Sequence, residues 1–248
     1  MARIDELFQY MLQYKASDLH LSSQCPPYFR IDGQITPLEV PPYDPETVWG
    51  LLAEIIPERN RVEFEEASDT DFAYELTGAS RFRVNVFRDR KGIGAVFRTI
   101  PTKVLSAEDL GLPPAILALC ELSKGLVVVT GPTGSGKSTT LAAMIDRINK
   151  SRYDHILTIE DPIEFTHNNI CCLVNQREVK VHTQSFKRAL RAALREDPDI
   201  VLIGEMRDLE TVESALRIAE TGPLTFGTLH TNSAAQTINR IIAIFPAH

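Results

Sequence analysis

The spacing of hydrophobic residues changes several times within the first 100 positions. A period near 3.6 residues predicts one helix at 4–12 and a second at 48–56, which Pro57 ends. A period of two predicts strands at 18–22, 28–36, 71–76, 81–87 and 94–100. The range 28–36 turns at Asp32-Gly33, which predicts a hairpin. Helices mixed with meandering strands indicate a small α+β domain over residues 1–100.

Strands and helices alternate regularly in the second half of the chain. The stretch 101–114 contains three prolines and Gly111, which predicts a linker. Apolar runs predict strands at 126–130, 156–160, 200–204 and 224–229, with an edge pairing around 172–175. Helical spacing predicts helices near 138–150, 184–196 and 208–220. This alternation is typical of α/β domains with a parallel sheet covered on both faces, here over residues 115–248.

A glycine-rich segment joins the first of these strands to the helix after it. It reads Gly131-Pro132-Thr133-Gly134-Ser135-Gly136-Lys137-Ser138-Thr139 and contains the pattern G-x-x-x-x-G-K-S. Its glycines let backbone N–H groups surround an anion, and the helix adds its positive amino end. We expect Lys137 to reach the β- and γ-phosphates and Ser138 to bind Mg²⁺. A glycine-rich turn with a chance lysine is the alternative, but the flanking strand and helix favour a nucleoside triphosphate site.

Polar residues follow three later strands, and open α/β sheets bind ligands at such strand ends. After the second strand, Glu160, Asp161 and Glu164 place three carboxylates within five residues. They are expected to bind a hydrated Mg²⁺ or to orient an attacking water, the alternative being a solvated acidic loop. Glu205 follows the third strand in the layout of a Walker B segment, which predicts a position beside metal and γ-phosphate. His230 follows the fourth strand. It is expected either to contact the γ-phosphate or to be a structural histidine.

Basic residues gather in two places. One group lies on the helix before the Walker B segment and has the pattern of a solvated basic face: Lys187, Arg188, Arg191 and Arg195. The other lies in the last strands of the first domain: Arg81, Arg83, Arg88, Arg90 and Arg98. In a ring of subunits, residues of the second group could reach a neighbour's nucleotide as arginine fingers.

Composition excludes several classes of protein. The formal net charge of −7 argues against a nonspecific grip on DNA or anionic lipid, although local basic patches remain compatible with it. No apolar run approaches the roughly 20 residues needed to span a bilayer, and the start has no signal-peptide pattern. The four cysteines lack metal-binding spacing, which favours reduced thiols in a cytoplasm.

Together and in this order, the segments resemble the secretion and type IV pilus ATPase family. The phosphate loop matches its Walker A segment, 160–164 its aspartate box, 197–208 its Walker B segment and 227–232 its histidine box. The resemblance covers essentially the whole chain. Four further segments resemble the pilus-retraction subgroup: 16–20, 81–85, 173–178 and 195–199.

The resemblance implies a RecA-like P-loop NTPase core behind a smaller PAS-like α+β domain. It implies ATP and Mg²⁺ as cofactors, with Ser138 and Glu160 as our candidate metal ligands. It also implies a homohexameric motor in the cytoplasm, at the inner face of the cytoplasmic membrane. There the motor would act on an inner-membrane pilus platform protein, in company with a related retraction ATPase and without binding nucleic acid directly.

The same resemblance assigns catalytic roles. Glu164 becomes the catalytic base, Glu205 the Walker B acid and His230 the second histidine of its box. Arginines of the first domain complete a neighbouring subunit's site in this family, and we select Arg83 and Arg98 as candidates for that role.

Two departures from the family pattern qualify these expectations. Pro223 stands where the family usually has the first histidine of the box, and proline supplies neither a titratable ring nor a backbone donor. That histidine's role is therefore not carried over, and a looser start of the strand is expected. The family also continues into a helical C-terminal region beyond residue 248, so the chain alone is expected to hydrolyse ATP weakly, to assemble poorly, or to be a truncated form of a longer protein.

Three alternatives stay open at this point. Pilus-extension and type II secretion ATPases typically carry a longer N-terminal extension and a four-cysteine zinc insert, neither of which this sequence shows. A RecA-like DNA-dependent ATPase would need a basic, often aromatic groove, which the overall acidity disfavours. A nucleotide-gated binding partner without catalysis is the third.

Overall fold

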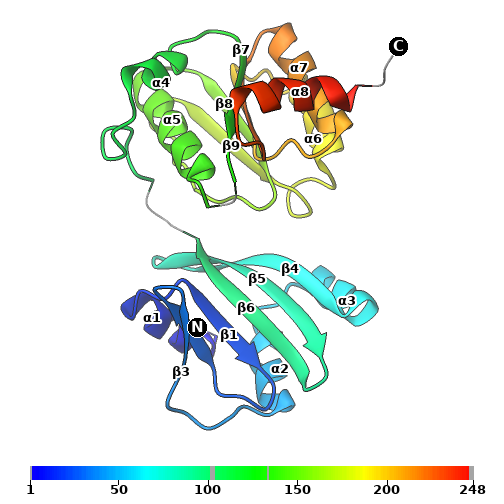
Figure 1. Ribbon diagram of the computed structural model, residues 1–248. Helices are drawn as coiled ribbons and strands as arrows, with labels where there is room; N and C mark the ends of the chain where they lie inside the picture. Colours follow the sequence, from blue (N-terminus) through cyan, green and yellow to red (C-terminus); the bar gives the residue numbers. More distant parts are fainter. Residues whose placement is uncertain (1, 101–103, 133, 246–248) are drawn as a thin grey trace. The chain divides into compact units, whose positions relative to one another are not determined.

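The chain forms two compact units, Met1–Thr102 and Lys103–His248. We describe each by itself from a computed structural model, in which residues 2–100, 104–132 and 134–245 are described (Figure 1). Part of the predicted linker, 101–103, lies outside these residues. The rest of it leads through turns to α4 (Pro114–Leu119).

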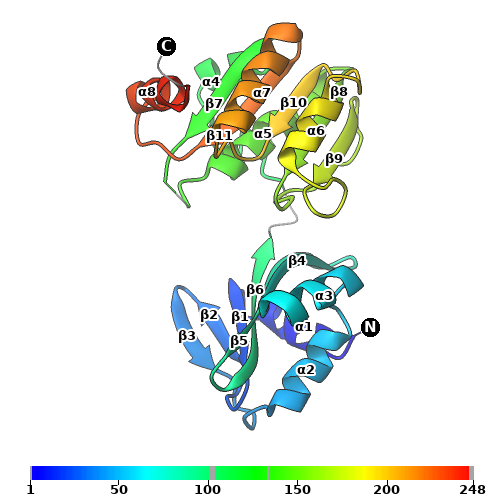
Figure 2. The same ribbon diagram turned by 90° about the vertical axis from the view of Figure 1, so that its right-hand side faces the viewer.

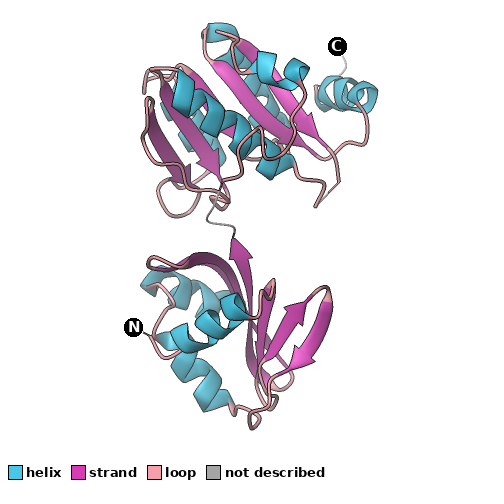
Figure 3. Cartoon of the chain, turned by 90° about the vertical axis from the view of Figure 1, so that its left-hand side faces the viewer, coloured by secondary structure: helices cyan, strands magenta, loops and turns pink. Residues whose placement is uncertain are grey.

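The first unit contains a six-stranded antiparallel sheet in the order β3-β2-β1-β6-β5-β4. Its strands are β1 (Asp18–Ser22), β2 (Tyr28–Ile31), β3 (Gln34–Pro37), β4 (Asp69–Leu76), β5 (Ser80–Asp89) and β6 (Gly92–Ile100). Its helices are α1 (Asp5–Gln13), α2 (Pro45–Ala53) and α3 (Glu58–Ala67). Figures 2 and 3 show all three helices on the same face of the sheet.

The core of this unit lies between the helices and the sheet. Phe8 of α1 is fully buried, with ring centroids 4.3 Å from Phe82 and 5.1 Å from Phe97. The predicted hairpin is present, since Ile31 pairs with Gln34 across the turn. The sequence pattern missed α3, whose residues are mostly charged and whose one buried apolar side chain is that of Phe64. With a single apolar anchor, no hydrophobic period is visible along that helix.

The second unit is built on a five-stranded parallel sheet in the order β7-β11-β10-β8-β9. Its strands are β7 (Gly125–Thr130), β8 (His155–Glu160), β9 (Leu173–Glu178), β10 (Ile200–Ile203) and β11 (Leu224–Leu229). Besides α4, its helices are α5 (Lys137–Ser151), α6 (Phe186–Ala193), α7 (Leu209–Thr221) and α8 (Ala234–Ile244). The predicted α/β fold with a parallel sheet is confirmed.

Helices cover both faces of this sheet. Apolar residues of α5, such as Met144, pack on one face, while α6 and α7 pack on the other through residues such as Leu190 and Ile218 (Figures 1 and 2). The crossover connections bring the carboxyl ends of all five strands to one edge. None of the described helices is long and apolar enough to cross a membrane.

Pro223 lies at the amino end of β11, remote from that edge. The strand begins at the next residue, Leu224, which is fully buried and pairs with Gly125 on one side and Ile200 on the other. Proline is tolerated at a strand entrance because its missing N–H falls outside the ladder. The looser strand start expected from the sequence is therefore not observed.

Candidate functional site

The phosphate loop connects β7 to α5, as its sequence predicts. Gly131 has a φ of +152°, and a Cβ there would come within 2.5 Å of the Ser135 Oγ atom. Gly136 has a φ of +90° and is the residue directly before α5. Both positions therefore require glycine. Of the other predicted loop residues, Pro132 and Gly134 lie in the loop and Thr139 lies in the first turn of α5. Thr133 lies outside the described residues.

Lys137 is the first residue of α5 and is almost fully buried. Its Nζ atom donates hydrogen bonds to the carbonyl oxygens of Gly131, at 2.9 Å, and Pro132, at 3.0 Å. These bonds hold the ammonium group against the loop that the sequence predicts to wrap the phosphates. A buried cation beside the amino end of a helix strongly attracts an anion.

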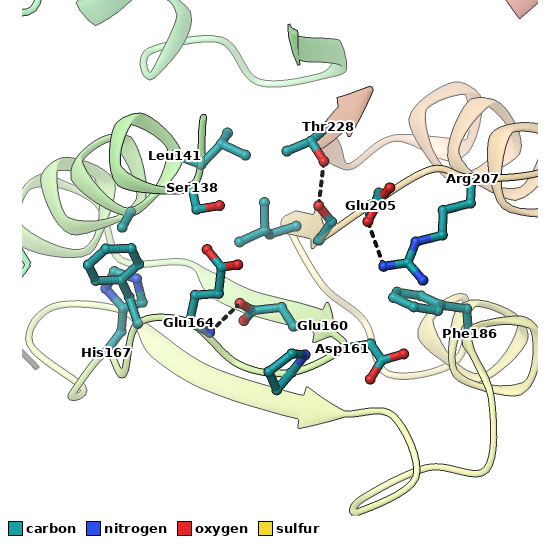
Figure 4. Close-up of a pocket in the computed structure, with 15 residues that line it drawn as sticks. Ser138, Leu141, Glu160, Asp161, Glu164, His167, Phe186, Glu205, Arg207 and Thr228 are labelled. Carbon is teal, nitrogen blue, oxygen red and sulfur yellow. Dashed lines mark hydrogen bonds and ion pairs between the residues drawn. The ribbon is translucent and has the colours of Figure 1, made fainter. Parts of the chain in front are cut away.

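A cavity of about 70 Å³ lies at the carboxyl edge of the sheet, with room for a few water molecules. Segments far apart in the sequence line it, including Ser138 of α5, Glu160 at the end of β8, Glu164 after β8 and Glu205 after β10. Figure 4 shows the Glu164 side chain rising toward Ser138, with Glu160 beneath it. The structure thus brings together four of the residues that the sequence predicts for metal binding and catalysis.

Glu160 is buried and engaged within the protein. Its Oε1 atom accepts hydrogen bonds from Thr158 Oγ1 at 2.6 Å and Gln176 Nε2 at 3.3 Å, and its Oε2 accepts one from the Glu164 backbone N–H at 3.4 Å. Burial raises the pKa of this carboxyl to about 7, although the three hydrogen bonds oppose the shift. The sequence offered no signal for Thr158 or Gln176 as partners of Glu160.

Replacing Glu160 by glutamine is expected to change how stability depends on pH. The folded carboxyl keeps its proton up to a pKa of about 7, whereas an unperturbed one loses it near 4.5. Between these values the unfolded chain binds fewer protons, so wild-type stability falls as pH rises, on the order of 3 kcal/mol in all. The glutamine variant lacks this fall. Chemical denaturation at about pH 5 and pH 8 measures the free energy of unfolding of both proteins. An equal change in this free energy in the two proteins would contradict the prediction.

Glu205 and His230 come from neighbouring strands and meet in the structure. His230 Nε2 lies 3.0 Å from Glu205 Oε1, and Arg207 donates to Glu205 Oε2 at 2.7 Å. Thr228 ties the two strand ends together by donating to the Gly204 carbonyl at 2.6 Å. Arg207 also lines the cavity. It lies within the Walker B match, but no separate sequence signal predicted a place for it in the site.

Arg83 and Arg98 belong to the first unit, whereas every residue that lines the cavity belongs to the second. They lie directly opposite each other on β5 and β6, and both are exposed. Arg98 Nε donates to the buried Asp18 carboxylate at 2.8 Å, and Ser17 Oγ donates to its other oxygen at 2.7 Å. Burial raises the pKa of Asp18, but these hydrogen bonds and the charge of Arg98 outweigh it and hold that pKa below its usual value.

The oxygen donors around the cavity fit a magnesium ion that is held mainly by phosphates and water. Among the described residues, no three His, Cys, Asp or Glu side chains are arranged to hold a metal by themselves. Mg²⁺ in nucleotide sites usually needs only one or two protein oxygens beside the phosphates. The Ser138 hydroxyl and the Glu164 carboxylate would meet that need, because the oxygens of Glu160 and Glu205 already have partners within the protein.

A glycine loop between strand and helix, a buried lysine and an acid-lined cavity at the same edge of a parallel sheet define a P-loop ATPase. Residues 1–245 match the family described as Type II/IV secretion system protein. The chain belongs to this family, and the resemblance inferred from its sequence is confirmed.

Individual relatives are similar over nearly the whole chain. The Type IV pilus retractation ATPase PilT of Pseudomonas aeruginosa is 56% identical over 98% of this chain and 71% of its own length. A twitching motility protein of Neisseria gonorrhoeae is 51% identical over 90% of this chain and 60% of its own length. The crystal structure of the pilus retraction motor PilT with bound ADP superposes with a TM-score of 0.94 at 50% identity, over 99% of this chain and 72% of that one.

Proposed function

We propose that this chain is an ATP-hydrolysing motor that powers the retraction of type IV pili. The observation that carries the proposal is the 56% identity to a pilus retraction ATPase over 98% of the chain. The cavity supports it chemically, because it gathers the acids that such hydrolysis requires beside the phosphate loop.

In the proposed reaction, the N–H groups of the phosphate loop and the Lys137 ammonium hold the phosphates of ATP. Bound Mg²⁺ would neutralise charge on the phosphate oxygens. Glu164 accepts a proton from a water whose oxygen attacks the γ-phosphorus, and the bond to the β–γ bridging oxygen breaks. Glu205 and His230 would contact the γ-phosphate side of the site. This role is supported by the place of Glu205 in the cavity lining and by the 3.0 Å distance between Glu205 Oε1 and His230 Nε2.

We further propose that the active form is a homohexamer in the cytoplasm, peripheral to the inner membrane. Arg83 and Arg98 of one subunit would stabilise developing charge in a neighbour's site, in the manner of arginine fingers. The exposure of both side chains supports this role. Domain movements driven by ATP would be passed to an inner-membrane platform protein, with a related retraction ATPase as a further partner.

Deleting the gene tests the direction of the motor. Cells that lack a retraction motor are expected to keep surface pili but to lose twitching motility, because pili still extend and no longer shorten. Electron microscopy of pili together with twitching zones on agar measures both properties. Loss of the pili themselves would contradict retraction, and for the purified protein the absence of phosphate release would contradict hydrolysis.

A further inference from the structure

The segment that carries Glu164 has no regular secondary structure of its own. It runs over residues 161–169, between β8 and β9. Ile163 and Phe165 are buried on either side of the exposed Glu164 side chain. An irregular segment needs partners for its buried backbone polar groups, and those partners decide where its side chains point.

Side chains of β9 supply most of those partners. Gln176 Nε2 donates to the Phe165 carbonyl at 2.8 Å, and Gln176 Oε1 accepts from the His167 N–H at 2.8 Å. One amide thus binds the segment at two points beyond Glu164. Glu178 Oε2 accepts from the Ile163 N–H at 3.1 Å, just before Glu164.

Gln176 and Glu178 act together because they are two residues apart on one strand. Side chains two apart in a strand project from the same face. Arg177 between them points to the other face, where it pairs with Glu196. Gln176 also donates to Glu160, whose Oε2 accepts the Glu164 N–H.

We propose that Gln176 is a positioning residue for catalysis, which fixes the backbone around Glu164 so that its carboxylate faces the site of the attacking water. The inference rests on the proposed role of Glu164 as the base. Gln176 is absent from the lining of the cavity and acts only through the segment it holds. Since a displacement near 1 Å in a reacting group lowers a rate by up to about 100-fold, loosening this segment should slow the chemical step.

Gln176→Leu tests the proposal, because leucine keeps much of the volume and removes all three hydrogen bonds. We expect kcat for ATP hydrolysis to fall about 10- to 100-fold while KM and ATP affinity change less than about twofold. The matched control is Asn175→Leu on the opposite face of β9, whose amide contacts His155 instead. This control should keep wild-type kcat. A kcat within twofold of wild type for Gln176→Leu, or an equal loss in the control, would overturn the proposal.

A double variant separates positioning from general structural support. If Gln176 acts through Glu164, Gln176→Leu added to Glu164→Gln should lower turnover no further than Glu164→Gln alone. Additive losses would overturn the proposal. If Glu164→Gln alone retains wild-type turnover, the proposed role of Glu164 fails instead, which is a distinguishable result.

A second variant, Gln176→Glu, tests the proposal if Gln176→Leu does not fold. Gln176→Glu retains the acceptor for His167 but lacks the amide donor for Phe165 and Glu160. Its new carboxylate oxygen would face two acceptors, the Phe165 carbonyl and Glu160, so kcat should fall at least as far as in the leucine variant, again without a change in ATP affinity. An unaltered kcat in a folded Gln176→Glu protein would also count against the positioning role.

Discussion

Glu164→Gln should lower ATP turnover by about 100- to 10,000-fold and leave ATP affinity nearly unchanged. The glutamine amide has the same size as the carboxylate but cannot accept a proton from water. Glu164 lines the cavity together with Ser138, and its side chain is exposed and points toward Ser138 (Figure 4). Single-turnover phosphate release, together with a titration of ATP binding, measures the two quantities separately.

The control for this prediction is Glu220→Gln, an exposed carboxylate on α7 outside the cavity lining. It should hydrolyse ATP at the wild-type rate. Wild-type turnover in Glu164→Gln would exclude Glu164 as the base and leave Glu205 as the next candidate. A parallel loss of ATP binding would show instead that Glu164 supports the nucleotide rather than the proton transfer.

Lys137→Ala should weaken ATP binding by about 100- to 1,000-fold. Hydrogen bonds to charged groups contribute about 1.5–3 kcal/mol each, and the ammonium is expected to bridge two phosphates. Two of its three N–H donors bond to the Gly131 and Pro132 carbonyls, so the ammonium is held beside the loop and exchanges at least one of these bonds to reach both phosphates. Calorimetric titration with ATP at fixed Mg²⁺ concentration gives the affinity.

Lys150→Ala is the matched control, because Lys150 lies in the last turn of the same helix and pairs with Asp146 on its surface. Its ATP affinity should equal that of the wild type. A normal titration curve for Lys137→Ala would exclude the phosphate-binding role of the loop lysine. Because Lys137 is buried, an unfolding curve of the variant should accompany the titration.

Most of the fold could be predicted because its elements have strong local signals. The strands β7, β8, β10 and β11 are largely apolar, whereas the edge strand β9 is mostly polar. Turns such as Asp32-Gly33 are predicted from their residue types. The missed helices have no such signal: α3 is mostly charged, α4 is six residues long, and the apolar residues of α8 such as Ile238 and Ile242 remain largely exposed. Local patterns identify elements that bury a periodic face, and these helices do so weakly.

The sequence by itself determined the phosphate loop, because glycine backbone freedom and the adjoining lysine are local properties of consecutive residues. It also placed acidic residues and a histidine at strand ends. Only the tertiary structure decided which of them meet: Glu205 with His230 and Arg207, and Glu160 with Gln176. Strand order and register bring Glu205 to His230 and Glu160 to Gln176 from positions 25 and 16 residues apart, and burial then sets whether a carboxyl such as Glu160 keeps its proton. Those are properties of the packed sheet, and no local stretch of sequence contains them.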